Sequence, residues 1–174
     1  MTRLLIYVQH LLGTGHLVRA LSLAEAFAAE GFTVFLVSGG FPLPRKELPR
    51  SVEFIQLPPL RALPGDFTAL VDEHDRPIDD HWKAARRDEL LRHATEIRPH
   101  AAIIETFPFG RRQLHFELLP LMENFAAMRP KPLLAASIRD VLQERTRARW
   151  QETADLVERY FDLVLVHGDP GLIP

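Results

Sequence analysis

A strand, a glycine turn and a helix follow one another without interruption at the start of this chain. Residues 4–8 (LLIYV) form a continuous apolar run, short enough for a strand that is buried on both faces. Apolar side chains then recur at spacings of three and four as far as Phe27, which predicts a helix with one buried stripe and with Arg19 on its water-facing side. Gly31 is placed to end this helix in the left-handed conformation. Strands buried on both faces belong to parallel sheets, and parallel strands need a crossover of this kind.

Two glycines join this strand to this helix. Gly13 and Gly15 flank Thr14, and a backbone without Cβ atoms can turn sharply there or approach a ligand closely. Thr14 has the side chain of a helix N-cap. His16 would then lie in the first helical turn, where the positive end of the helix dipole favours the neutral imidazole, which could accept a proton. The glycines and His16 could equally serve only the turn and its local hydrogen bonds.

The same alternation continues along the chain. Further strands are predicted at residues 33–37, 52–57, 101–104, 133–138 and 163–166. Helices are predicted to begin at Asp79 and to span residues 111–127, where Pro120 is expected to cause a kink or a split, and about residues 141–160. The core face of the last helix is expected to contain Trp150, Ala154, Val157 and Phe161. Residues 60–77 have no steady period, and we expect a disordered loop there.

Strands that alternate with helices predict an α/β domain of the doubly wound, Rossmann-like type, with a parallel sheet of about six strands and helices on both faces. In such sheets ligands bind beyond the carboxyl ends of the strands. The polar residues that follow the strands are Gln9 and His10, Glu105 and Thr106, Arg139 and Asp140, and His167. If the central strands are neighbours, these side chains lie along one edge. Glu105 could equally cap a helix or form a salt bridge, and Arg139 and Asp140 could be a surface pair, with Asp140 as an N-cap.

Two arginines, Arg111 and Arg112, stand at the predicted start of a helix. Cations there oppose the helix dipole at a cost of ~0.3 to 1 kcal/mol each. A bound phosphate would offset this cost, and the forked guanidinium suits phosphate geometry. Without a ligand, both side chains would extend into water.

Composition and missing motifs exclude several classes of protein. The 174 residues suit one globular domain, and a net charge of -2 gives no electrostatic basis for binding nucleic acid. The chain has no cysteine for a thiolate site, and its N-terminal apolar run is too short for a signal peptide, so we expect a cytoplasmic protein. Val18 stands where the dinucleotide-binding pattern needs its third glycine, and the P-loop, nucleophile-elbow and zinc-helix motifs do not occur. We therefore expect no cofactor and no metal, and interpret Gly39 and Gly40 as a plain turn.

Three segments carry a resemblance to a known family. They are QHLLGTGHLVRALSLAEAFAAEGFTVFLVSGG (residues 9–40), ETFPFGRRQLHFELLPLMENF (105–125) and SIRDVLQER (137–145). Together they resemble the N-terminal half of a GT-B glycosyltransferase. More narrowly, the chain is similar to predicted bacterial transferases distantly related to the enzyme that adds N-acetylglucosamine to the lipid-linked peptidoglycan precursor.

The resemblance implies that residues 1–174 are the acceptor-side domain, with the C-terminal donor-binding domain absent and the fragment inactive alone. The partners would be a nucleotide-sugar donor, UDP-linked, and an unknown acceptor. Lipid-linked chemistry would bring residues 118–122 into contact with a membrane, although helical spacing favours ordinary core.

The resemblance also implies roles for individual residues. His16 matches the general base of many inverting members, and Glu105 or Asp140 would orient its imidazole. The binding residues are expected to be Gly13, Thr14, Gly15, Arg111 and Arg139. One glycine precedes His16 where the peptidoglycan enzymes commonly carry two, so their acceptor is not assumed. Two alternatives stay open: a stand-alone module that binds an anionic small molecule, and half of a nucleotide-sugar epimerase.

Overall fold

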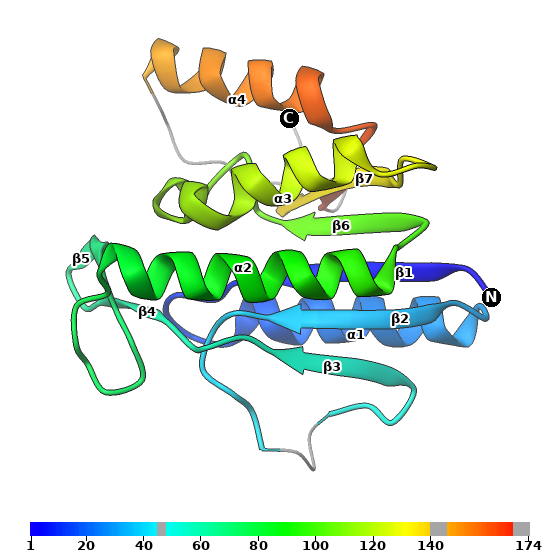
Figure 1. The fold of residues 1–174 in the computed structure, drawn as a ribbon, viewed down its shortest axis with the longest axis horizontal. Coiled ribbons are helices and arrows are strands. Elements are labelled where there is room, and N and C mark those ends of the chain that lie inside the picture. The colour runs from blue at the N-terminus through cyan, green and yellow to red at the C-terminus, as the bar shows by residue number, and fades with distance from the viewer. Residues whose placement is uncertain (45–47, 140–145, 169–174) are drawn as a thin grey trace.

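In the computed structural model, residues 1–44, 48–139 and 146–168 are described (Figure 1). Six parallel strands form the main sheet, in the order β3-β2-β1-β6-β7-β8. They are β1 (Arg3–Val8), β2 (Thr33–Ser38), β3 (Val52–Gln56), β6 (Ala101–Glu105), β7 (Leu133–Arg139) and β8 (Leu163–His167). The doubly wound α/β fold is thus confirmed. The strand order reverses between β1 and β6, and ligands bind at such switch points.

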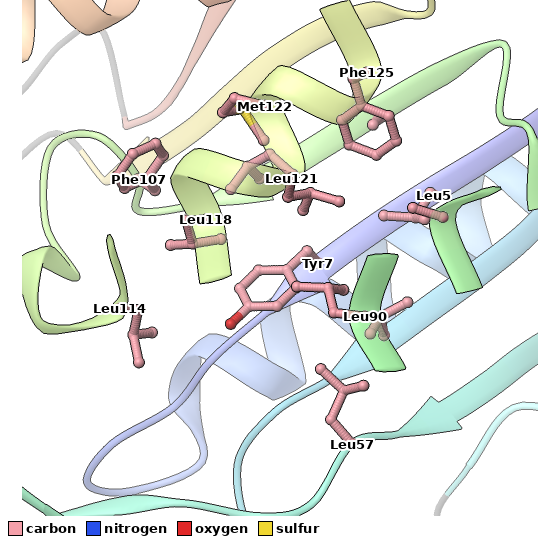
Figure 2. Packing of buried hydrophobic residues seen from close by; sticks show 14 of the residues in the cluster. Leu5, Tyr7, Leu57, Leu90, Phe107, Leu114, Leu118, Leu121, Met122 and Phe125 are labelled. Atoms are coloured by element: carbon pink, nitrogen blue, oxygen red, sulfur yellow. The ribbon is translucent and has the colours of Figure 1, made fainter. Parts of the chain in front are cut away.

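Helices cover both faces of this sheet (Figure 1). α1 (Gly15–Ala29) packs on the face that carries Leu4 and Ile6 of β1. α2 (Asp80–Ile97), α3 (His115–Ala127) and α4 (Arg147–Tyr160) contribute to the core on the opposite face, against Leu5 and Tyr7. Figure 2 shows Tyr7 beside Leu90 of α2 and below the apolar side chains of α3. None of the described helices is both long and apolar enough to cross a membrane.

The segment expected to be disordered contains a hairpin. β4 (Arg61–Leu63) and β5 (Asp66–Val71) pair antiparallel, and Gly65, with φ +86°, makes the turn between them. Ala62 and Leu70 are buried in the core on the α2 face, and the Ala62 amide donates to the carbonyl of Leu11 at 3.4 Å. The prediction was wrong because β4 has only three residues and the six residues of β5 (DFTALV) neither form a continuous apolar run nor alternate strictly between apolar and polar. The hairpin is held in place by tertiary contacts with the β1–α1 loop, which the local sequence does not show.

Two helix predictions also need correction. α3 runs without interruption through Pro120, and the change of helix type falls earlier, where the 3-10 helix η2 (Arg112–Leu114) meets α3. In α4 the fully buried side chains are Thr153 and Tyr160, whereas Trp150 and Ala154 are exposed and Val157 and Phe161 are partly buried. The Thr153 hydroxyl can be buried because it donates to the carbonyl of Arg149, one turn earlier, at 2.9 Å. The expected first residues of this helix, 141–145, lie outside the described residues.

Candidate active site

Polar side chains from four neighbouring elements meet at the carboxyl edge of the sheet. β6 and β7 place Glu105 opposite Ser137, and β7 and β8 place Arg139 opposite His167. His16, in the first turn of α1, lies over the end of β6. The predicted convergence of the strand ends is therefore present for β6, β7 and β8, whereas the Gln9 side chain after β1 bonds to Arg86 instead.

The Glu105 carboxylate is the centre of this group and is 2% exposed. Its Oε1 lies 3.0 Å from Nδ1 of His16 and also accepts from the guanidinium of Arg19. Its Oε2 accepts from the hydroxyl of Ser137 at 2.6 Å, and this hydroxyl lies 3.0 Å from Nε2 of His167. Of the two carboxylates expected to face the imidazole, Glu105 does so, and Asp140 lies outside the described residues. The alternative role of Glu105 as a salt-bridge partner is present as well, through Arg19.

The expectation that Arg19 faces water was wrong. Its side chain is 21% exposed and pairs with Glu105. Helical spacing could have predicted that Arg19 faces the site, because Arg19 follows His16 by three residues and therefore lies on the same side of α1. The polar face of α1 turns toward a carboxylate that a neighbouring strand supplies, and sequence spacing within one helix does not show such a partner.

His16 is held in its neutral form. Burial lowers its pKa to about 4, and the positive charges of Arg111, Arg19 and Arg139 act in the same direction, whereas the Glu105 carboxylate, 3.0 Å from Nδ1, acts in the opposite one. The contact with Glu105 favours the tautomer with the proton on Nδ1, since a carboxylate accepts a hydrogen bond. Nε2 then carries the lone pair that can take a proton from a substrate. The sequence argument reached the neutral form from the helix dipole, whereas burial and nearby arginines are the main causes.

The glycine turn is exposed. Gly13 has φ +68°, which explains glycine there, and a Cβ added at Gly13 or Gly15 would meet no atom within 4 Å. Thr14 occupies the N-cap position, but its side chain makes no capping hydrogen bond, contrary to expectation. The turn therefore presents open backbone beside His16.

Arg111 and Arg112 go in different directions. Arg111 has the left-handed φ of +64°, and its Nε donates to the Gln9 carbonyl at 3.0 Å. Arg112 is exposed and pairs with Glu152 of α4 at 2.9 Å. The dipole argument was wrong for both, because α3 begins only at His115 and the intervening η2 has three residues. Arg111 is instead directed toward the end of β1, and Arg139 lies exposed at the end of β7.

A buried polar network, which sequence analysis did not find, supports the end of β1. Arg86 donates to Glu117 (Nε to Oε2, 2.7 Å) and to the side-chain oxygen of Gln9 (2.8 Å). Tyr7 donates to Oε1 of Glu117 at 2.6 Å. Gln9 thereby links this network to Arg111, which binds its carbonyl. The available signal was a charged residue in each apolar stripe, since Arg86 stands one turn before Leu90 and Glu117 stands among the leucines of α3.

The glycines after β2 are explained by this network. A Cβ on Gly39 would overlap the side chains of Gln9 and Arg86, and a Cβ on Gly40 would overlap the ring of His10. The segment is thus a close-packed turn around protein side chains. His10, considered as a residue of the rim, is buried there.

Comparisons with known proteins agree on the fold alone. No family model and no curated protein matches the chain. Apo UGT2 of Phytolacca americana aligns with a TM-score of 0.56 and 16% identity, over 99% of this chain and 47% of that one. Its complex with UDP-2fluoro-glucose and pterostilbene aligns with a TM-score of 0.56 and 17% identity, over 99% and 49%. MurG of Acinetobacter baumannii aligns with a TM-score of 0.54 and 14% identity, over 100% and 43%.

The chain has the fold of GT-B glycosyltransferases. It spans less than half of the length of each of these proteins. At such identities their substrates do not transfer to this chain, so function has to be argued from the site. Within the described parts of the chain, no three histidine, aspartate or glutamate side chains are grouped closely enough to hold a metal ion.

Proposed function

We propose that this chain is the acceptor-side half of a glycosyltransferase that moves a sugar from a UDP-linked donor to an acceptor hydroxyl. The observation that carries the proposal is the His16–Glu105 pair, with Nδ1 and Oε1 3.0 Å apart, at the switch point of a GT-B-type sheet. The pair combines a neutral imidazole, a buried carboxylate behind it and open glycine backbone in front of it. These are the parts that a general base needs.

The reaction is a single inverting displacement. Nε2 of His16 takes the proton of the acceptor hydroxyl while that oxygen forms a bond to the anomeric carbon. The bond from this carbon to the donor phosphate breaks on the opposite side, and the nucleoside diphosphate leaves with the electron pair. Glu105 accepts the Nδ1–H of His16 and stabilises the imidazolium that forms, while Ser137 and Arg19 hold the carboxylate in place.

Replacement of the base is the direct test. In an enzyme that joins this chain to its donor-binding half, we expect His16→Ala to lower sugar transfer ~100- to 10,000-fold, the usual range for a general base. His81→Ala is the matched control, because His81 is exposed on α2 and should leave the rate unchanged. Transfer from UDP-N-acetylglucosamine is measured for both variants. An unchanged rate in His16→Ala would remove His16 from the mechanism.

The division between acceptor and donor halves is tested separately by calorimetric titration of the chain itself. We expect UDP and UDP-N-acetylglucosamine to bind no tighter than inorganic pyrophosphate, since the uridine would be recognised by the other half. Tight, saturable binding of UDP would favour the alternative of a stand-alone module for an anionic small molecule. The arginines around His16 are the observation that keeps this alternative in view.

A further inference from the structure

Three arginines from three separate elements surround His16. Arg19 comes from α1, Arg111 from the turn before η2, and Arg139 from the end of β7. All three are close enough to His16 for their charges to lower its pKa, and burial together with the charge of Arg139 lowers the pKa of Arg19. Three like charges are thus gathered at one edge of the sheet, although the chain as a whole has a net charge of -2.

The described residues balance only one of these charges. Arg19 pairs with Glu105, whereas the described parts of the chain offer no ion pair to Arg111 or Arg139. Arg111 uses Nε for the carbonyl of Gln9, and its half-buried guanidinium has a pKa lowered by burial. The buried Nε–H of Arg19 has no hydrogen-bond partner among the residues that the structure describes. Buried donors are almost always satisfied, so an unpaired N–H beside unbalanced positive charge points to a missing acceptor.

We propose that Arg19, Arg111 and Arg139 form a binding site for an anionic group of a substrate, a phosphate or a carboxylate, beside His16. This inference rests on the proposed function for its choice of ligand, because the anion would belong to the acceptor or to the diphosphate of the donor. Guanidinium groups suit both oxyanions, because their parallel N–H donors match pairs of oxygen atoms. The backbone of Arg111 is consistent with a functional role, since it has a left-handed φ of +64°, which is uncommon for arginine and is often found at functional sites.

The bound anion would also change the base. The groups that face His16 are Glu105 from β6, the three arginines, and His10 from the β1–α1 loop. With a pKa of about 4, the free imidazole is a weak base at neutral pH. An anion among the arginines offsets the charges that lower this pKa. Substrate binding therefore strengthens the base at the moment when it is needed.

Sulfate is the probe for this site, because it does not titrate near neutral pH. Backbone amides of Gly13, Thr14 and Gly15 are followed by NMR at pH 7, with sodium chloride replaced by sulfate at constant ionic strength. We expect saturable shifts, and a loss of affinity of at least ~10-fold in Arg139→Gln, whose exposed side chain has no structural partner among the described residues. Arg112→Gln is the matched control, since Arg112 neighbours Arg111 but pairs with Glu152.

A second measurement follows the imidazole of His16. Sulfate should raise its pKa by about one unit or more in the unaltered chain and by less in Arg139→Gln, because each compensated charge favours the imidazolium. The proposal is overturned if sulfate causes no saturable shift, or if Arg139→Gln and Arg112→Gln bind it equally well.

Two further arms identify the source of the anion and separate this proposal from the proposed function. Pyrophosphate that binds more than ~10-fold tighter than sulfate would assign the site to the donor diphosphate, and equal affinities of the two anions would assign it to a single anionic group of the acceptor. His16→Ala should retain sulfate binding while it loses transfer. Retained transfer in that variant would defeat the proposed base but leave the anion site standing, whereas absent sulfate binding would defeat the anion site alone.

Discussion

Two buried glutamates, each paired with an arginine, lie near the same edge of the sheet but on its opposite faces. Glu117 and its partner Arg86 have side chains that are both 0% exposed. Glu105 is 2% exposed, but its partners Arg19 and His16 are 21% and 29% exposed. The first pair is closed within the core, and the second opens toward solvent.

This difference in exposure indicates a structural role for the Glu117 pair and a chemical role for the Glu105 pair. Glu117 has Arg86 and Tyr7 as donors, and neither donor has a free path to a ligand. A closed pair of this kind can only hold elements together. Glu105 holds an imidazole through Nδ1, and its second nitrogen, Nε2, makes no hydrogen bond to the described residues. The exposure of the partners, rather than the burial of the carboxylate, therefore distinguishes the two roles.

The largest effect is expected in the closed pair. Arg86→Met leaves the Glu117 carboxylate buried without its cation, which typically costs about 3 to 5 kcal/mol of unfolding free energy. Urea unfolding measures this loss. Arg87→Met is the control, because its ion pair with Asp88 is exposed and should contribute less than about 1 kcal/mol. A cost for Arg86→Met as small as that of the control would show that the closed pair does not support the fold.

The open pair should respond in activity more than in stability. Glu105→Gln keeps the shape of the side chain but removes the charge that stabilises the imidazolium. We expect transfer by the joined enzyme to fall ~10- to 100-fold, part of the contribution of a general base. The loss of unfolding free energy should be smaller than in Arg86→Met, since the freed Arg19 can reach water. The reverse ranking, with stability lost and transfer kept, would make Glu105 a structural residue like Glu117.

The order of strands and helices could be predicted from the sequence, because buried parallel strands are continuous apolar runs. Residues 4–8 and 101–104 are of this kind, and the α1 stripe follows the 3.6-residue period. The sequence could also place His16 and Glu105 at strand and helix ends. It left Glu105 and Asp140 open as partners of the imidazole, because the contact between His16 and Glu105 joins residues 89 positions apart. Sequence spacing also could not predict that Arg111 binds the end of β1, 102 positions away.

The pH dependence of stability gives the smallest and most specific effect. The pKa of His16 is about 4 in the folded chain, below the ordinary 6.5, so the unfolded chain binds the extra proton first as pH falls. Its contribution to stability is present above pH 6.5 and is lost progressively between pH 6.5 and 4. In His16→Gln, the loss of unfolding free energy between pH 7 and pH 5 should be smaller by roughly 1 kcal/mol. His10, His115 and His167 also have lowered pKa values, so part of the dependence should remain.

Urea unfolding at the two pH values provides the measurement, and His81→Gln, on exposed α2 surface, should keep the full dependence. Equal slopes for all three proteins would mean that the imidazole of His16 is not held neutral, and the open pair would then lack the base that distinguishes it from the closed one.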